Sequence, residues 1–319
     1  MNKKILYIHQ GSHPVHGAFA SVITSDYANA GNTYFQMLLR LFGAIRDNNY
    51  DIAFLEGGMC LPYAYIKKIF NPRMKIILLN ADNLFYILPH SPILKSKIMR
   101  FFVSKVDSII SISELNKKEA SKYFNGKIYV VNSFGINNHF EINADIQSNK
   151  LLFIGNKRFD KRYDLLVDAL KLLNKDHDFE LYLVGSSGDD VDVDYSWLHK
   201  EGQKDDIKPY LEKCSLYIHP ADYEAYGVSI LESMSAGMIP LVTPNCGAHE
   251  TLKKEGLDFL ILENNQPHTI ACKIMEIYEK PFSWKKKVSQ QCVKISKKYS
   301  QKKQTEKFSA IFKKICQGI

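Results

Sequence analysis

Two glutamates, Glu224 and Glu232, stand on either side of a turn of small residues. A carboxylate accepts hydrogen bonds from neighbouring hydroxyls, which is the recognition that a sugar ring needs. The turn contains Gly227, and the apolar spacing from Val228 onward predicts a helix that starts near this glycine. The unpaired N–H groups and positive dipole end of such a helix bind phosphate. Hydroxyls, a diphosphate and hydroxyls in that order describe a nucleotide-diphosphate sugar.

The elements around these residues indicate an α/β protein. Tyr217 and Ile218 end an apolar run that predicts a buried strand, and residues 219–222 break it. Segments typical of strands and helices alternate along the whole chain, which favours parallel sheets. A length of 319 residues predicts about two domains.

The stretch that carries the two glutamates, E-A-Y-G-V-S-I-L-E-S-M-S-A-G from Glu224, is followed by an apolar strand and by G-A-H-E at 247–250. It resembles the donor-site signature of retaining glycosyltransferases of family 4, among the group 1 glycosyltransferases. The resemblance implies the GT-B fold, with two Rossmann-like, doubly wound domains facing across a cleft. We expect an acceptor-side domain over residues 1–142 and a nucleotide-sugar-binding domain over 143–319, with the last helix crossing back to the first domain.

Basic residues crowd the loop after Gly155, where phosphate ligands lie in open α/β sheets. Lys161 falls on the family's lysine position, which implies a contact with the donor diphosphate. The family's arginine position holds Asn156 instead. We assign the arginine role to Arg158 by proximity, with Lys157 as the alternative.

The first domain offers a glycine loop and several polar side chains as candidates for the site. Gly11 resembles a glycine loop that approaches the donor phosphate, because glycine permits a close backbone approach. Many family members carry a histidine where this chain has Asn80, and Asp82 nearby could hold a sugar hydroxyl or the acceptor proton. Three histidines near the glycine loop are alternatives for this role: His9, His13 and His16.

The resemblance also implies a mechanism and the residues that perform it. Glu224 orients the transferred sugar, Glu232 binds the ribose, and the backbone amides of Gly227, Val228 and Ser229 hold hydroxyls or phosphate. No metal is needed where a helix N-terminus and basic side chains stabilise the departing diphosphate. We therefore expect no cofactor and a UDP- or GDP-linked sugar as co-substrate.

The implied reaction transfers a sugar, with retention, to a glycan, a lipid-linked saccharide or another hydroxyl acceptor, as in cell-surface polysaccharide biosynthesis. The alternative is a non-catalytic nucleotide-sugar-binding or scaffold protein with a degenerate site. Asn156 and Asn80 keep this alternative open.

Composition and charge limit the compartment and the partners. Six cysteines are scattered without a metal-like spacing, and no apolar run approaches a membrane span, so we expect a cytoplasmic protein. Residues 283–319 hold eleven lysines and one glutamate. This tail is either the solvated face of packing helices or a surface for anionic lipid, and residues 94–105 are a second candidate for peripheral contact with the inner face of the membrane. No nucleic-acid-binding motif is present.

Overall fold

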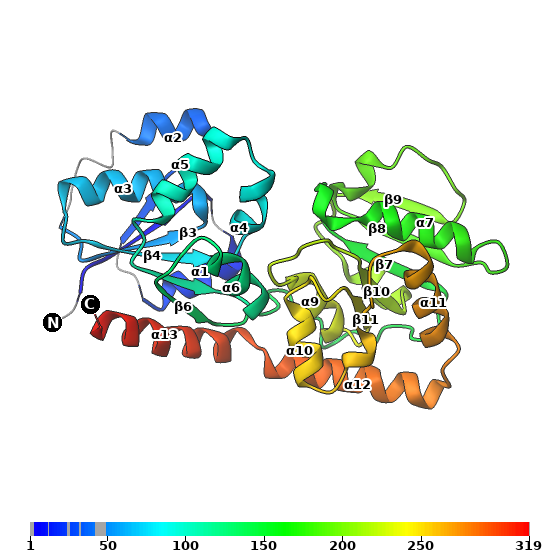
Figure 1. Ribbon diagram of the computed structural model, residues 1–319. Coiled ribbons are helices and arrows are strands. Elements are labelled where there is room, and N and C mark those ends of the chain that lie inside the picture. Colours follow the sequence, from blue (N-terminus) through cyan, green and yellow to red (C-terminus); the bar gives the residue numbers. More distant parts are fainter. Residues whose placement is uncertain (1–2, 12, 24–25, 32, 42–48, 319) are drawn as a thin grey trace. The chain divides into compact units, whose positions relative to one another are not determined.

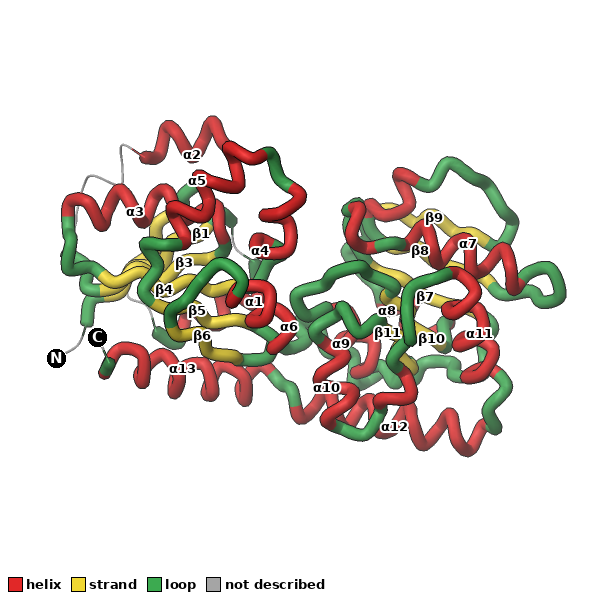
Figure 2. Tube along the Cα trace, viewed as in Figure 1, coloured by secondary structure: helices red, strands yellow, loops and turns green. Residues whose placement is uncertain are grey.

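A computed structural model describes residues 3–11, 13–23, 26–31, 33–41 and 49–318. The chain forms two compact units (Figure 1). Unit 1 comprises Met1–Ser133 together with Gln301–Ile319, and unit 2 comprises Phe134–Ser300. Both are parallel α/β structures, as the alternation of predicted strands and helices indicated, and Figure 2 shows the strands of each unit between helices.

Within the described residues, the sheet of unit 1 has the strand order β2-β1-β3-β4-β5-β6, all parallel. Its central strands are continuous apolar runs, as expected for a sheet that is covered on both faces. The strands are β1 (Ile5–His9), β2 (Asp26–Asn29), β3 (Ile52–Glu56), β4 (Lys75–Asn80), β5 (Ser108–Ser111) and β6 (Lys127–Val130). The strand order reverses at β1, because β2 is added on one side of β1 and β3 on the other.

The helices of unit 1 include the last helix of the chain, α13 (Gln301–Gln317). Its buried Phe308 stacks on Phe19 with ring centroids 4.7 Å apart, and both Phe308 and Phe312 contact Phe54 of β3. The other α-helices are α1 (Pro14–Ser21), α2 (Tyr34–Leu41), α3 (Leu61–Phe70), α4 (Leu84–Ile87), α5 (Ile93–Val103) and α6 (Glu114–Ser121).

The sheet of unit 2 has the order β11-β10-β7-β8-β9, also parallel. The strands are β7 (Lys150–Ile154), β8 (Glu180–Val184), β9 (Leu198–Gly202), β10 (Leu216–His219) and β11 (Ile239–Val242). The α-helices are α7 (Tyr163–Leu173), α8 (Lys208–Lys213), α9 (Val228–Ser235), α10 (Ala248–Lys254), α11 (Pro267–Tyr278) and α12 (Phe282–Lys298). The strand order reverses between β7 and β10, since β8 and β9 follow on one side of β7 and β10 and β11 on the other. Ligands of open α/β sheets bind beyond the carboxyl ends of such a strand pair.

The segment after Ser133 belongs to unit 2, whereas we expected the first domain to extend to residue 142. The backbone amides of Ile136 and Asn137 donate to Glu232 Oε1, and the amide of His139 donates to Ser235 Oγ at 2.7 Å. These bonds connect the segment to α9, nearly a hundred residues further along the chain.

Candidate functional site

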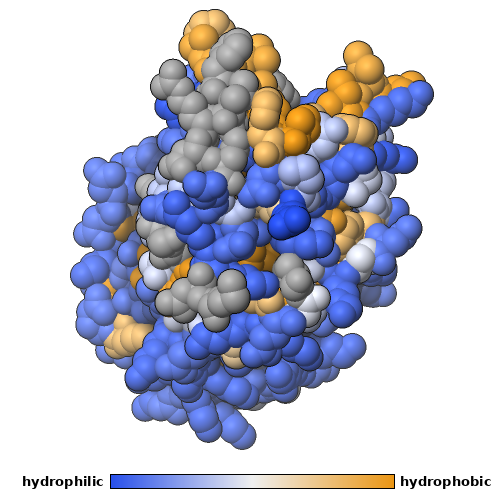
Figure 3. Space-filling view, turned by 90° about the vertical axis from the view of Figure 1, so that its left-hand side faces the viewer, coloured by the Kyte–Doolittle hydropathy of each residue, from blue (hydrophilic) through white to orange (hydrophobic). Residues whose placement is uncertain are grey.

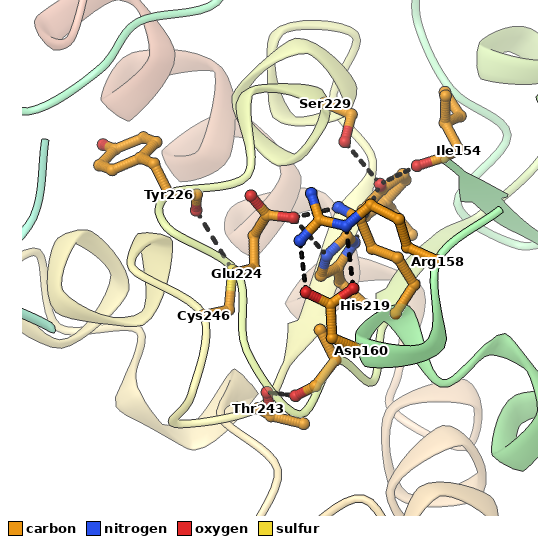
Figure 4. Close-up of polar contacts among 12 residues, drawn as sticks. Ile154, Arg158, Asp160, His219, Glu224, Tyr226, Ser229, Thr243 and Cys246 are labelled. Atoms are coloured by element: carbon orange, nitrogen blue, oxygen red, sulfur yellow. Dashed lines mark hydrogen bonds and ion pairs between the residues drawn. The ribbon is translucent and has the colours of Figure 1, made fainter. Parts of the chain in front are cut away.

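The loops that follow β7 and β10 bring together a lysine and a glutamate where the strand order of the second sheet reverses. Figure 4 shows the glutamate, Glu224, near His219 and Arg158. Lys161 ends a short 3-10 turn after β7, and its Nζ forms an ion pair with Glu224 Oε2. Both side chains are largely buried, with 12% and 13% of their surfaces exposed. Lys161, which the sequence predicts to bind the diphosphate, therefore contacts Glu224, which the sequence predicts to orient the sugar.

The backbone of Glu224 is held between two loops. Its N–H donates to the carbonyl of Asn245 at 3.0 Å, and its carbonyl accepts from Gly247 N–H at 2.9 Å. The loop after β11 thus supports the loop after β10 through main-chain bonds. This support fixes the carboxylate beside Lys161, as a preorganised site requires.

Neighbouring charge and burial have opposite effects on the pKa of Glu224. Burial alone would raise the pKa of this carboxyl, but Lys161 and the nearby His219 together hold it well below the usual range. His219 Nε2 lies 3.5 Å from Glu224 Oε2. Burial and the Lys161 charge lower the pKa of His219, so the imidazole is neutral beside an ionised carboxylate.

Tyr217 connects the two strands to the helix that follows. Its hydroxyl lies 2.7 Å from Ser229 Oγ and donates to the carbonyl of Ile154, at the end of β7, at 3.2 Å. Ser229 is in the first turn of α9, so this contact fixes the helix start against the sheet. The side chain of Ser229 is engaged, and its predicted role as a donor-binding residue depends on its backbone amide.

The start of α9 requires a glycine. Gly227 has a left-handed φ of +91°, and a Cβ there would collide with the side chain of Ile230 and crowd Cys246. No side chain caps the helix N-terminus in the described structure. The amide groups of Val228 and Ser229 in this first turn are thus suited to an anionic ligand.

Glu232 lies inside α9 and is buried. Its Oε1 accepts from Asn137 N–H at 2.9 Å and from Ile136 N–H at 3.1 Å. Burial raises the pKa of this carboxyl, and the two amides oppose that rise. Both amides donate to the same oxygen. Glu232 therefore holds the 134–142 segment, in addition to the ligand binding predicted for it.

The other basic residues of this loop have carboxylate partners. Arg158 makes a two-pronged ion pair with the fully buried Asp160, with Nε 2.9 Å from Oδ1. Lys157, the alternative for the same role, pairs with Asp190. Gly155 approaches the next strand end closely, because a Cβ on Gly185 would collide with the Gly155 carbonyl.

In unit 1, the predicted residues mainly support loops. Asp82 accepts from Gly58 N–H at 3.3 Å and from Leu84 N–H at 3.0 Å. Asn80 is buried, and its amide donates to Ser111 Oγ and to the carbonyl of Asn116. Gly11 has open space around its Cα, because a methyl group added to it would meet no described atom within 4 Å.

A second carboxylate cluster lies at the reversal point of the first sheet, and the sequence interpretation did not identify it. Glu56, at the end of β3, accepts from Tyr7 at 2.6 Å and lies 2.8 Å from His16 Nδ1 of α1. The His13 and His16 rings are 4.3 Å apart. Burial would raise the pKa of Glu56, but His16 and Tyr7 lower it. The histidines were alternatives in the sequence, whereas Glu56 lacked any signal except its position at a strand end.

Among the residues that the structure describes, no group of three or more His, Cys, Asp or Glu side chains could hold a metal ion. Within the same residues, every helix is too short or too polar to cross a bilayer.

Residues 136–299 match the family model described as glycosyl transferases, group 1. An uncharacterized glycosyltransferase of Methanocaldococcus jannaschii is 26% identical over 212 residues, which cover 59% of this chain and 58% of that protein. The chain thus spans somewhat over half the length of this relative.

Two solved structures resemble the fold over almost the whole chain. Anabaena HepE in complex with UDP-glucose aligns with a TM-score of 0.75 at 14% identity, covering 98% of this chain and 100% of the other. Sucrose-phosphate synthase of Thermosynechococcus elongatus aligns with a TM-score of 0.77 at 13% identity, covering 99% and 100%. Together with the two parallel-sheet units, these similarities confirm the predicted GT-B fold.

Proposed function

Because the chain belongs to the group 1 glycosyl transferases, we propose that it transfers a sugar from a nucleotide-diphosphate sugar to a hydroxyl acceptor with retention of configuration. The observation that carries this proposal is the Lys161–Glu224 ion pair beside the uncapped start of α9. A buried cation, a buried carboxylate and the first backbone amides of a helix lie at one edge of the second sheet. This set matches a ligand that has both a diphosphate and a hydroxylated ring.

On the donor side, the diphosphate binds at the N-terminus of α9 and takes the Lys161 ammonium as its counter-ion. Glu224 then exchanges part of its contact with Lys161 for hydroxyls of the sugar. Glu232 accepts from the ribose through the oxygen that the two amides do not use. Arg158 adds charge near the phosphate only if its contact with Asp160 opens, so we assign it a smaller contribution.

In the transfer step, the bond between the anomeric carbon and the phosphate oxygen breaks, and a bond to the acceptor oxygen forms on the same face. The acceptor proton passes to the departing phosphate. Lys161 and the helix amides stabilise the developing negative charge without a metal ion. The ionised Glu224 stabilises the positive charge that develops on the sugar, and no covalent intermediate on this side chain is required.

The acceptor is proposed by its chemical class. We propose a saccharide or lipid-linked hydroxyl acceptor, as in cell-surface polysaccharide biosynthesis, with Asp82 of unit 1 as a candidate to accept a hydrogen bond from a sugar hydroxyl. The complex of HepE with UDP-glucose supports a uridine-linked donor, and a guanosine-linked donor is the alternative.

A second candidate function is a nucleotide-sugar-binding protein without turnover. It is favoured by Asn80, which replaces the histidine of many family members and whose side-chain N–H groups donate to Ser111 and Asn116. The two candidates differ in chemistry, since both require donor binding and only the first requires transfer or hydrolysis.

One experiment separates them. The purified chain is incubated with a panel of UDP- and GDP-linked sugars, donor binding is measured by calorimetry, and the anomeric configuration of the first sugar released is read by proton NMR. A retained anomer supports the proposal, and an inverted anomer overturns it. Binding without any released or transferred sugar supports the second candidate.

A further inference from the structure

Helix α5 exposes an apolar stripe on the side opposite to its buried face. Leu94 is 71% exposed, and Ile98 and Phe101 are each 45% exposed. At 3.6 residues per turn these three side chains share one face, since they are spaced i, i+4 and i+7. The core-facing residues of the same helix lie on the other side: Ser96, Met99 and Val103. The stripe is therefore not part of the core of unit 1.

Neighbouring helices extend this apolar surface. α3 packs against both α2 and α5, and Figure 3 shows hydrophobic side chains gathered at the top of the molecule, where Figure 1 places α2 and α5. α2 exposes Phe35 at 70%, with Leu38 and Leu39 at i+3 and i+4, and α3 exposes Ile69 and Phe70. Single exposed apolar residues are ordinary, whereas a contiguous group on adjacent helices marks an interaction surface.

Basic residues outnumber acidic ones around this surface. Residues 61–107 contain eight lysines and arginines and two acidic residues, Asp82 and Asp107, and Asp107 pairs with Lys68 and Lys75. On α5 itself, Lys95, Lys97 and Arg100 are exposed and flank the apolar stripe on both sides. Lys105 lies with its Nζ 4.9 Å from the centre of the Phe101 ring. The partner must therefore offer an apolar interior and a negative surface.

We propose that the α2–α5 face, defined by α2, the end of α3 and α5, binds an anionic lipid bilayer with α5 lying in the plane of the interface. Leu94, Ile98 and Phe101 enter the acyl boundary, while the flanking lysines extend their stems toward the headgroups. Anionic lipids supply the complementary charge. A second copy of the chain fits less well, because pairing this face with itself would bring two basic surfaces together.

The basic tail has the opposite arrangement. Its apolar side chains are buried, among them Val288 and Ile295 of α12 and Phe308 and Phe312 of α13. What the tail exposes is mainly lysine. It attracts anionic surfaces by charge alone, and such attraction decays within about 10 Å at 0.1 M salt.

The test is co-sedimentation of the whole protein with phosphatidylcholine vesicles, with and without phosphatidylglycerol. We expect binding that rises with the anionic lipid and that high salt reduces without abolishing. The variant Leu94→Ser/Ile98→Ser/Phe101→Ser should remove the salt-resistant part, and Lys95→Glu/Lys97→Glu should weaken binding to anionic vesicles about tenfold or more. Lys95 and Lys97 are exposed, so their variant should keep the wild-type melting temperature. Phe101 also contacts the Tyr65 ring, so the triple serine variant should lower the melting temperature slightly and remain folded by circular dichroism.

The matched control is Lys286→Glu/Lys287→Glu on α12, which reverses two exposed lysines of the tail. This variant should retain the salt-resistant binding. Equal losses in the control and in the Lys95/Lys97 variant would show attraction by net charge alone and overturn the proposal. Equal partitioning onto neutral and anionic vesicles also overturns it, as does a wild-type dimer that ignores vesicles and becomes monomeric in the triple serine variant.

Discussion

Each sheet of the molecule carries a desolvated carboxylate at the point where its strand order reverses, and the two carboxylates have different partners. Glu224, after β10 in unit 2, forms an ion pair with the ammonium group of Lys161. Glu56, at the end of β3 in unit 1, accepts a hydrogen bond from the Tyr7 hydroxyl and lies beside the His16 ring. The pKa of each carboxyl is lowered, by a cation in one unit and mainly by hydrogen bonding in the other.

The difference indicates which kind of ligand each site can accept. In the proposed function, the Lys161–Glu224 ion pair separates to give a cation for a phosphate and a carboxylate for hydroxyls. Among the residues that the structure describes, no lysine or arginine pairs with Glu56, and we propose that this cluster suits a neutral hydroxyl ligand better than an anion. The following changes test this comparison.

The largest effect is expected for Glu224→Gln, which keeps the shape and removes the charge. Turnover should fall about 100-fold while donor affinity changes much less, because the charge matters most in the transition state. Steady-state kinetics and calorimetry measure the two quantities. Glu141→Gln removes a carboxylate from the exposed Lys208–Glu141 ion pair and should leave both unchanged. A Glu224 variant with wild-type turnover would remove the residue from the mechanism.

Lys161→Ala should weaken nucleotide-diphosphate-sugar binding about 10- to 100-fold, since a charge-assisted contact contributes about 1.5–3 kcal/mol. It should also lower the melting temperature, because Glu224 is left buried without its cation. Lys208→Ala, the cation of the exposed pair, is the control for both measurements. Unchanged affinity for UDP and GDP sugars alike would place the diphosphate elsewhere.

Glu232 separates ligand binding from support of the chain. Glu232→Ala leaves the amides of Ile136 and Asn137 without their acceptor and should cost about 1–3 kcal/mol of unfolding free energy. Glu232→Gln retains one acceptor oxygen, so its stability loss should be smaller. If the carboxylate binds the ribose, both variants weaken the donor by a similar factor. A donor loss only in the alanine variant would leave Glu232 with the supporting role alone.

The smallest effect is expected at Glu56. Because its folded pKa is below the ordinary value of about 4.3, the ionised carboxylate stabilises unit 1 above that pH, and the contribution is lost as pH falls through the folded pKa. The stability gap between the wild type and Glu56→Gln should be present at pH 7 and shrink in acid. Urea unfolding at several pH values measures this gap. A gap that widens in acid would contradict the assignment.

The sequence predicted unit 2 more fully than unit 1 for a physical reason. Glu224, Gly227 and Glu232 lie in one short stretch, and the strand–turn–helix geometry follows from local spacing. Lys161 is distant in sequence, yet the carboxyl ends of adjacent parallel strands meet at one edge, which makes its contact with Glu224 foreseeable. The GT-B fold and membership of group 1 are confirmed, whereas assignment to family 4 and the roles of individual residues stay predictions.

What the sequence did not reveal depends on contacts between distant segments. The Glu56 cluster takes one residue each from β1, α1 and β3, and none of these carries a local pattern. Arg158 was assigned by proximity to the phosphate loop, but the buried Asp160 two residues away competes for its guanidinium. The 134–142 segment joins unit 2 because its backbone amides are the hydrogen-bond donors that the buried Glu232 carboxylate needs. The residue types of this segment do not predict that contact.

The return of α13 to unit 1 has a consequence for the order of folding during synthesis. Unit 2 is continuous in sequence, so all of its residues have left the ribosome while unit 1 still lacks its last helix. Until that helix emerges, Phe19 and Phe54 have no Phe308 or Phe312 to cover them. The first residues made therefore complete their packing last, and a nascent chain stopped near residue 300 exposes an aromatic surface that chaperones recognise.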